Sequence, residues 1–434
     1  MHLYDLIRKK KMGAALSLEE IHKLLKGFVA EIIPIEEMAA LITTICFTSM
    51  TQQEILDWTQ ALADSGSHLD LSVLEQETAD KHSTGGLGDK TALVALPIAA
   101  ACGVAVPKLI SAGSGNRLGT LDKLSAIPGF QTSWSAKELA ALVKANGLAI
   151  AERMAELAPA EQKLRALQHT IAAEDCLPLL SAGIMSRKIA DGVSCIVLDI
   201  KAGSGADLKT IGEARKLALS MTQTARFYGK KCRALLTNME KPLGRTIGCV
   251  PEMIEAIQTL KGYSGGDVYM LSIELAANMQ FLAGIDTTME GCRMQAAKAV
   301  QSGTALEKLK SMILAQGGDP LVTEEYSLFM QPEQKQSVLA QRDGFITRIN
   351  CDLCGETAAE LGAVRKNYKD VTDVSAGILF HRQVGEFVQQ GECIADLYTS
   401  STSGLDKAAK RFSGAFEVDA RPVKSLGIIL EQIS

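Results

Sequence analysis

The sequence predicts a multidomain protein with a helical lobe, a large α/β lobe with a mostly parallel sheet, and a C-terminal α/β appendage. Three observations predict this class. Capping-box patterns start amphipathic stretches within residues 1–70. Between about residues 80 and 334, short apolar runs ending in glycine-rich turns alternate with helical stretches, as buried parallel strands and their helices do. After residue 335, strand patterns broken by glycine follow.

The first segment of the helical lobe is predicted over residues 1–70. Ser17 and Glu20 form a capping-box pattern ahead of an apolar stripe, and Thr51 and Glu54 repeat that pattern before a second stripe. The apolar positions of both stripes follow helical spacing. We therefore expect these residues to form amphipathic helices that pack together.

The α/β lobe is predicted in two segments, residues 71–159 and 193–334. The runs "VAVPKLI", "CIVLDIKAG" and "CRALLTN" are typical of buried parallel strands. Residues 160–192 are helical and charged, and they interrupt the α/β pattern. We expect them to rejoin the N-terminal helices as a second segment of the helical lobe. Ligands bind at the carboxyl ends of the strands in such sheets.

Residues 335–434 are predicted to form a separate C-terminal domain. The stretch "DGFITRINCDLCGETAAELGA" is typical of a strand, a turn and a helix. The stretch "AGILFHRQVGEFVQQGECIADLYTS" resembles the hammerhead of biotinyl and lipoyl domains. It lacks their modified lysine in a tight turn, so we expect a hammerhead-like β element without a swinging cofactor.

Composition excludes several partners and indicates a compartment. The formal net charge of −5 favours neither nucleic acid nor an anionic membrane. No uncharged apolar run reaches spanning length, and no apolar segment follows the charged N-terminus. Ten scattered cysteines suit reduced thiols, so we expect a cytoplasmic protein. Cys351 and Cys354 have CxxC spacing, but no second pair completes a zinc site, and no metal is predicted.

The stretch "KHSTGGLGDK" at residues 81–90 combines an ammonium, an imidazole and two hydroxyls with a glycine loop. A glycine loop before a helix exposes backbone N–H groups and the positive end of the helix dipole. With Lys81, Ser83 and Thr84, this is a chemically complete anion site. It lacks the order of a P-loop, so it is not an NTPase signature. The alternative is a polar turn between two elements.

Two further glycine loops strengthen the hypothesis of a shared binding crevice. The stretch "SAGSGNRLGTLDKL" spans residues 111–124 and places Thr120 near the start of a predicted helix. The motif "AGSG" recurs at residues 202–205, directly after an apolar run. Three such loops at apparent strand ends favour one crevice over isolated tight connections, although a single loop would be weak support.

Four blocks carry a resemblance to a known family. "DKHSTGGLGDKTALVALPIAAACGV", "GTLDKLSAIPGF", "IMSRKIADG" and "IVLDIKAGSGA" closely resemble blocks of thymidine phosphorylase and pyrimidine-nucleoside phosphorylase, and the similarity runs through the whole chain. The resemblance implies a helical lobe built from two chain segments and a homodimer formed through it. It also implies a closing cleft with phosphate on the α/β side and the base on the helical side.

The chemistry implied by the resemblance is phosphorolysis, the reaction of a pentosyltransferase that uses inorganic phosphate as co-substrate and no cofactor. Phosphate attacks the anomeric carbon of a nucleoside and the base leaves, through an oxocarbenium-like transition state. The family's phosphate residues fall on Lys81, Ser83 and Thr120, and its base-facing histidine on His82. We expect Lys81, His82 and Arg187 to carry the catalytic roles.

At the phosphate site the chain departs from the family at two positions. One serine that holds phosphate in the family falls on Ile110, where the adjacent Ser111 is a possible substitute, and another falls on Ala92.

The base-reading positions have all changed together. An arginine, a serine and a lysine of the family fall on Gln168, Gly183 and Arg187. The first change removes a charged donor fork, and the second removes a hydroxyl and opens space. A site built to hydrogen-bond one base discriminates strongly against others. We therefore expect a base specificity shifted away from uracil and thymine; the alternative is drift without consequence.

A monovalent cation bound by some family members is predicted to be replaced by a side chain. Lys90 stands where those members have a threonine ligand, and Leu243, Thr246 and Glu255 stand at the other ligand positions. An ammonium at Lys90 could occupy the cation position. The alternative is a solvated surface lysine.

The sequence thus predicts a cytoplasmic homodimeric nucleoside phosphorylase that acts on nucleoside and phosphate, with pyrimidine metabolism as its setting. The alternative is a catalytically silent homologue that senses a nucleotide or sugar phosphate. Phosphoribosyl transfer ranks low, because no acidic cluster suits magnesium and diphosphate. Which base, which pentose, and whether degradation or salvage is the role do not follow from the sequence.

Overall fold

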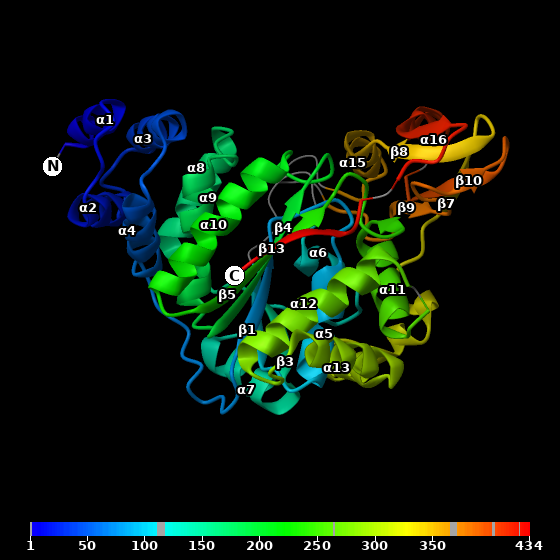
Figure 1. Cartoon of the computed structure of the whole chain (residues 1–434), viewed down its shortest axis with the longest axis horizontal. Coiled ribbons are helices and arrows are strands. Elements are labelled where there is room, and N and C mark those ends of the chain that lie inside the picture. The colour runs from blue at the N-terminus through cyan, green and yellow to red at the C-terminus, as the bar shows by residue number, and fades with distance from the viewer. Residues whose placement is uncertain (1, 111–117, 264, 365–370, 402–403, 425) are drawn as a thin grey trace.

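A computed structural model describes residues 2–110, 118–263, 265–364, 371–401, 404–424 and 426–434. Its first part is helical, with both predicted capping boxes formed, by Ser17 with Glu20 and by Thr51 with Glu54. The N-terminal helices are α1 (Leu3–Lys11), α2 (Leu18–Val29), α3 (Ile35–Thr48) and α4 (Gln52–Ala63). They lie at one end of the molecule (Figure 1).

Two later helices, α8 (Pro159–Thr170) and α9 (Leu177–Ala190), pack against these N-terminal helices. One buried cluster joins Phe28 and Trp58 of the first segment to Leu164 and Leu179 of the second. The helical lobe therefore contains two segments of the chain that lie far apart in the sequence. The boundaries between the lobes, as predicted from the sequence, stay predictions.

The central sheet of the α/β lobe is mostly parallel. Strands β1 (Ala79–Ser83), β4 (Cys195–Ala202) and β5 (Lys231–Asn238) are parallel neighbours, and β13 (Ile429–Ile433) pairs antiparallel with β5. Strands β2 (Val106–Ile110) and β3 (Leu148–Glu152) pair in parallel, and a parallel bridge from Thr78 to Ala105 connects them to β1. The return of the C-terminal strand to this sheet was not expected from the sequence pattern.

Helices cover both faces of the sheet. Successive residues of its buried strands point to opposite sides, so each face carries apolar side chains that need a covering layer. Along β4, Cys195 and Val197 belong to one core cluster, whereas Ile196 and Leu198 belong to the other. The helices of this lobe are α5 (Thr91–Ala101), α6 (Thr120–Leu124), α7 (Ala136–Asn146), α10 (Ile211–Phe227), α11 (Cys249–Leu260), α12 (Asp267–Ala283), α13 (Met289–Gln301) and α14 (Thr304–Ala315).

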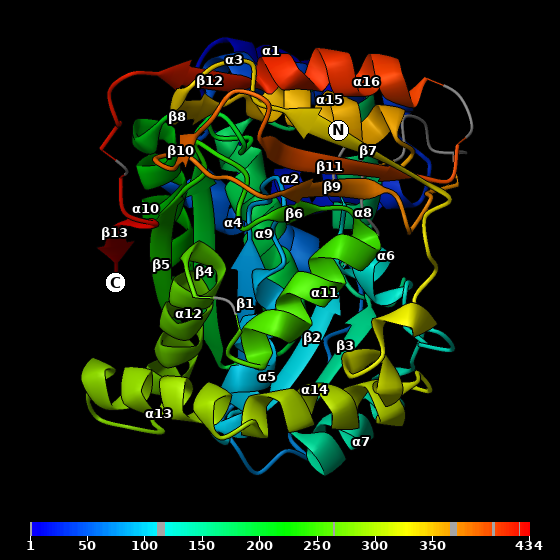
Figure 2. The ribbon, with the colours of Figure 1, turned by 90° about the vertical axis from the view of Figure 1, so that its right-hand side faces the viewer.

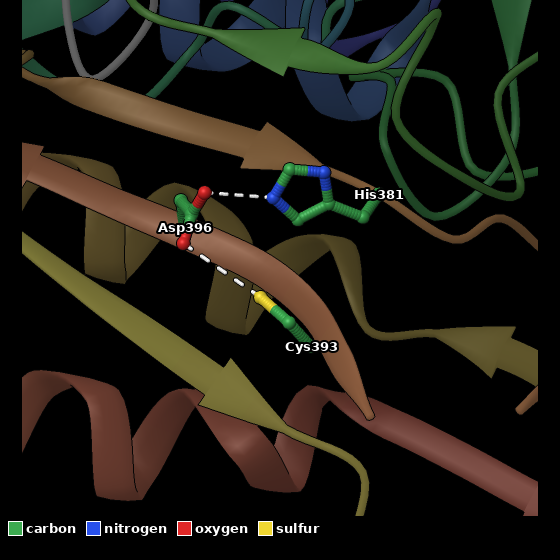
Figure 3. Close-up of side chains that lie close together, drawn as sticks. All are labelled: His381, Cys393 and Asp396. Carbon is green, nitrogen blue, oxygen red and sulfur yellow. Dashed lines mark hydrogen bonds and ion pairs between the residues drawn. The ribbon is translucent and has the colours of Figure 1, made fainter. Parts of the chain in front are cut away.

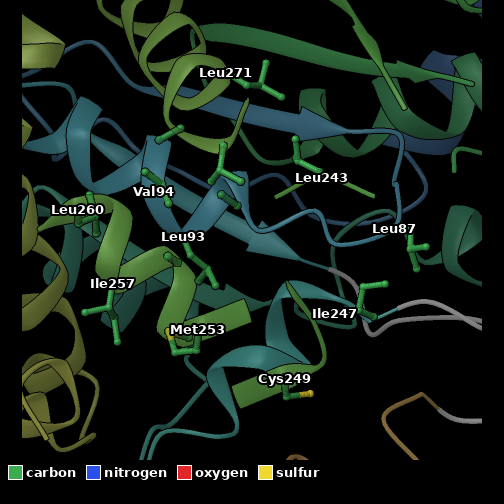
Figure 4. Packing of buried hydrophobic residues seen from close by; sticks show 14 of the residues in the cluster. Leu87, Leu93, Val94, Leu243, Ile247, Cys249, Met253, Ile257, Leu260 and Leu271 are labelled. Atoms are coloured by element: carbon green, nitrogen blue, oxygen red, sulfur yellow. The ribbon is translucent and has the colours of Figure 1, made fainter. Parts of the chain in front are cut away.

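Helix α5 follows the first glycine loop and is buried along almost its whole length. Leu93 and Val94 of this helix share a core cluster with Met253 and Ile257 of α11 and with Leu271 of α12 (Figure 4). A helix that is apolar all round needs partners on every side. The glycine loop is therefore anchored to the most buried part of the lobe.

The C-terminal domain contains two antiparallel sheets, in the orders β10-β8-β12 and β6-β9-β11-β7 (Figure 2). Its elements are β7 (Gln334–Leu339), β8 (Gly344–Ile349), α15 (Cys351–Glu360), β9 (Gly377–Phe380), β10 (Phe387–Val388), β11 (Cys393–Thr399), α16 (Leu405–Phe412) and β12 (Phe416–Asp419). Strand β6 (Thr246–Ile247) belongs to the α/β lobe by sequence and joins the second sheet. Single 3₁₀ turns lie at Pro320–Thr323, Tyr326–Leu328 and Ser413–Ala415.

Candidate active site

A cavity of about 750 Å³ opens between the helical lobe and the α/β lobe. One wall comes from the carboxyl ends of β1 and β2 and the start of α6, and the opposite wall comes from α8 and α9. This position agrees with the expectation that ligands bind at the carboxyl ends of parallel strands. The predicted residues that line it are Lys81, His82, Ser83, Ala92, Ile110, Thr120, Gln168, Gly183 and Arg187.

The side chain of Lys81 is buried and ends among acidic and hydroxyl groups. Its Nζ lies 2.9 Å from Oδ2 of Asp199 and donates a hydrogen bond of 2.6 Å to Oγ1 of Thr91. Burial lowers the pKa of Lys81, but the carboxylates of Asp199 and Asp89 outweigh it, and the net shift is upward. The lysine therefore stays charged at neutral pH and can attract an anion.

Ser83 connects the glycine loop to the same acidic group. Its Oγ donates to Oδ2 of Asp89 at 2.6 Å and accepts from the backbone N–H of Gly85 at 3.1 Å. Burial raises the pKa of Asp89, but Lys201 and Lys81 reverse this and hold it well below its usual range. An anion arriving beside Ser83 therefore meets an acidic neighbour as well as two lysines.

Thr120 is the first residue of α6 and faces the cavity from the second glycine loop. The helix is held in place by Lys123, whose Nζ pairs with Glu252 at 2.8 Å and donates to the backbone carbonyl of Asp89. The hydroxyl of Thr120 and the loop of residues 81–90 therefore share one framework. Ser111, the possible substitute for the missing serine, lies outside the described residues.

His82 faces the cavity from β1 and is neutral at physiological pH. Burial lowers its pKa well below the usual value, and the charges of Arg187 and Lys188 add to this effect. A neutral imidazole can donate one hydrogen bond and accept another. His82 is thus equipped to hydrogen-bond a ligand rather than to attract an anion.

A buried charge network beneath His82 was not anticipated from the sequence. Lys108 donates to Oδ1 of Asp80 at 2.9 Å, and Lys188 reaches Oδ2 of the same carboxylate at 2.5 Å. Lys188 also pairs with Asp191 at 2.6 Å, and Arg153 holds that carboxylate with two further hydrogen bonds. The charge of Lys108 within the apolar run "VAVPKLI" was a signal that could have revealed it.

Burial and ion pairing have opposing effects on the pKa values of this network. Burial lowers the pKa of Lys108 to about 8, although Asp80 opposes the shift. For Asp191, burial raises the pKa, but Arg153 and Lys188 outweigh it and bring the value down to about 2. The network therefore holds strong fixed charges next to the cavity.

On the opposite wall, Gln168 of α8 and Gly183 and Arg187 of α9 all line the cavity, so the structure brings the three changed positions together. Arg187 is buried, and its Nη1 lies 3.0 Å from Oε1 of Glu161. Burial lowers the pKa of Arg187 to about 10, which still leaves it charged at neutral pH. Sequence reasoning did not single out Glu161.

Lys90 lies at the N-terminus of α5, outside the cavity lining, with its side chain almost fully buried. Its Nζ donates to the carbonyl oxygens of Leu243 at 2.9 Å and Thr246 at 3.0 Å, to Oγ1 of Thr246 at 3.2 Å, and to Oε2 of Glu255 at 2.7 Å. Four oxygens thus surround the ammonium. Lys90 is therefore not a solvated surface lysine.

One group of possible metal ligands lies away from the cavity, on the C-terminal sheet. His381, Cys393 and Asp396 bring their ligand atoms within 4.8 Å of one another (Figure 3). Asp396 already accepts from His381 at 2.7 Å and pairs with Lys335 at 2.8 Å. These bonds link β7 and the residue that follows β9 to β11, and we interpret the group as a structural network. Cys351 and Cys354 are buried thiols at the start of α15.

Among the described helices, none combines the length and apolar character needed to cross a bilayer.

The chain matches three family descriptions in sequence order. Residues 4–66 match the helical bundle domain of a glycosyl transferase family, residues 75–306 match the a/b domain of that family, and residues 345–419 match the C-terminal domain of pyrimidine nucleoside phosphorylase. A solved anthranilate phosphoribosyltransferase from Thermus thermophilus has a similar fold, with a TM-score of 0.56 over 71% of this chain and 98% of that chain, at 17% identity.

Curated relatives match over nearly the whole length. The chain is 37% identical to the pyrimidine-nucleoside phosphorylase of Geobacillus stearothermophilus, with 100% of both chains covered. It is 36% identical to the enzyme of the same name from Staphylococcus haemolyticus, with 97% of each covered. Full-length identity at this level, with all three domains in the same order, shows the family. The chain belongs to the pyrimidine-nucleoside phosphorylase family.

Proposed function

We propose that this protein catalyses phosphorolysis of a nucleoside, giving a free base and a pentose 1-phosphate. The observation that carries the proposal is the cavity in which Lys81, Ser83 and Thr120 of one wall face Arg187 of the other. A phosphate oxygen forms a bond to the anomeric carbon while the bond from that carbon to the base nitrogen breaks. The base leaves with the electron pair of the broken bond.

On the α/β wall, Lys81, Ser83 and Thr120 hold the phosphate. Two hydroxyls and one ammonium supply charge-assisted and neutral hydrogen bonds to its oxygens. Asp89 lies among them and pairs with Lys81 only at 3.7 Å. Its charge is offset by Lys201 at 3.6 Å. The two ammonium groups of Lys81 and Lys201 match the carboxylates of Asp89 and Asp199 in number, so phosphate binding depends on the hydrogen-bond donors of Lys81, Ser83 and Thr120 rather than on a net positive charge.

His82 of the α/β wall and Arg187 of the helical wall stabilise the departing base. Negative charge develops on the base as its bond to the pentose breaks, and a fixed cation in a buried site stabilises such charge strongly. Arg187 supplies the cation, and the neutral ring of His82 supplies a hydrogen bond. Because Arg187 is held by Glu161, little reorganisation of the cation is needed at the moment of bond breaking.

The base specificity is shifted from uracil and thymine. Gln168 in place of an arginine and Gly183 in place of a serine remove donors that would meet the carbonyls of those bases. Losing a hydrogen bond to a charged group costs about 1.5–3 kcal/mol, and each 1.4 kcal/mol corresponds to about tenfold in rate. Uridine and thymidine should therefore be poor substrates while phosphate binding stays intact.

The protein acts as a homodimer formed through the helical lobe, in the cytoplasm and without a cofactor. Large apolar side chains stand exposed on the outer helices of that lobe, with Phe47 87% and Tyr4 71% exposed. All ten cysteines are unpaired, which suits a reducing compartment. Sedimentation analysis tests the dimer: Phe47→Glu should shift the protein toward a monomer.

The test of the proposed function is phosphate-dependent base release from a panel of nucleosides, with pentose 1-phosphate as the second readout. Lys81→Ala should abolish turnover and the thermal stabilisation given by phosphate. Lys209→Ala, at an exposed lysine, is the matched control and should retain both. If phosphate still stabilises the wild-type protein but no nucleoside releases its base, the protein is a catalytically silent homologue.

A further inference from the structure

Glu161 places an unpaired acceptor on the helical wall of the cavity. The residue lies in the first turn of α8 and is only 3% exposed. Its Oε1 pairs with Arg187, whereas its Oε2 has no hydrogen-bond partner among the described residues. A buried acceptor without a donor costs about 1–3 kcal/mol, and more for a charged group. A ligand that brings a donor to Oε2 would relieve that cost.

Gly183 lies next to the carboxylate of Glu161. A side chain at position 183 would begin only 3.4 Å from Oε1 of Glu161. Glu161, Gly183 and Arg187 all line the cavity. Glu161, Gly183 and Arg187 therefore form one recognition surface, which we call the Glu161 corner, with an acceptor beside a fork of donors.

Gln168 lines the same wall of the cavity as the Glu161 corner. Gln168 follows Glu161 by two helical turns, about 10 Å along the axis of α8. Arg187 pairs directly with Glu161, so a single edge of a base can meet both groups. In that arrangement the terminal group of the edge meets the carboxylate, while the adjacent groups meet the donors of Arg187.

Resting on the proposed phosphorolysis, we infer that the Glu161 corner selects a 4-aminopyrimidine, the base type of cytosine. Its edge carries an amino donor followed by a ring nitrogen and a carbonyl, both acceptors. The amino group donates to Oε2 of Glu161, and the guanidinium of Arg187 donates to the two acceptors. The imide edge of uracil and thymine ends in a carbonyl on both sides, which would set oxygen against the carboxylate.

Measurements of nucleoside binding test this inference independently of turnover. Calorimetry with cytidine and with uridine, in the absence of phosphate, should give at least about tenfold tighter binding of cytidine. Steady-state phosphorolysis with phosphate should favour cytidine over uridine by a similar factor in kcat/KM. Tighter binding of uridine, or of inosine or guanosine, would overturn the inference. If the protein binds cytidine more tightly than uridine but turns over neither nucleoside, the inference is supported and the proposed phosphorolysis is contradicted.

The variant Glu161→Gln separates recognition from a structural role. A glutamine keeps the shape and an acceptor for Arg187 but turns an N–H donor toward the base. The preference for cytidine over uridine should fall by about tenfold or reverse. Glu31→Gln removes an exposed carboxylate that pairs with Lys163 of α8 and should leave the ratio unchanged. An equal loss for both nucleosides in Glu161→Gln, with phosphate-dependent thermal stabilisation intact, would mean that Glu161 merely supports Arg187.

Discussion

Replacing Lys90 by threonine should make the stability of the protein depend on potassium. The Lys90 ammonium occupies the centre of an oxygen cage made by two backbone carbonyls, the hydroxyl of Thr246 and the carboxylate of Glu255. Such oxygens are also the ligands that proteins use to replace the hydration shell of K⁺. We therefore expect the truncated side chain to leave a site that a monovalent cation can fill.

The magnitude follows from the groups left without a partner. Removing one member of a buried ion pair typically costs about 3–5 kcal/mol, and here Glu255 would remain buried opposite two unpaired carbonyls. A cation that binds the folded state with a Kd of about 1 mM would return about 2.7 kcal/mol at about 100 mM. The variant should thus lose several kcal/mol in choline chloride and regain about half or more in potassium chloride.

Thermal unfolding of wild type and variant in the two salts, at equal ionic strength, measures this effect. The wild-type transition and the wild-type rate should be the same in both salts, since the cage already contains its cation. Lys209→Thr, an exposed lysine, is the control for loss of charge alone. A wild-type enzyme that needs potassium, or a Lys90→Thr variant that is equally stable in both salts, would refute the reasoning.

Three further predictions address the active-site cavity. Lys81→Ala should lower phosphorolysis to background and abolish the rise in melting temperature caused by phosphate, because the variant loses the cation nearest the proposed anion site. The triple change Gln168→Arg, Gly183→Ser and Arg187→Lys should raise kcat/KM for uridine and thymidine. An unchanged kcat/KM would show that these positions do not determine base specificity. Lys108 has a pKa lowered to about 8 in the fold against 10.5 as its ordinary value, so the unfolded chain binds more protons between these values. Denaturant unfolding should therefore show wild-type stability rising relative to Lys108→Met as pH increases through this interval.

Sequence reasoning was most successful where the information is local. The capping boxes at Ser17 and Thr51 formed as predicted, because a cap and its N3 partner lie three residues apart. The order of helical, α/β and C-terminal parts followed from hydrophobic periodicity, which reports burial directly. The contacts of Lys90 lie far along the chain and could be expected only from the resemblance to a family.

The unanticipated parts depend on contacts between distant segments. Glu161 is one acidic residue in a charged helical stretch, and only its packing against Arg187 and Gly183 gives it a special position. The ion-pair network of Asp80 and Lys108 likewise joins two strands whose pairing is not encoded in either one alone. Such sites become visible only when the fold brings the charges together.

The pairing of β13 with β5 has a consequence for synthesis of the chain. The partner of β5 comes from residues 429–433, which are synthesised long after β5 itself. Until then, β5 presents an open edge of unpaired N–H and C=O groups, the kind of edge on which nascent chains associate with one another. The five-residue strand β13 thus covers this edge of the sheet, so deletion of residues 429–433 should cause aggregation during expression before any loss of catalysis.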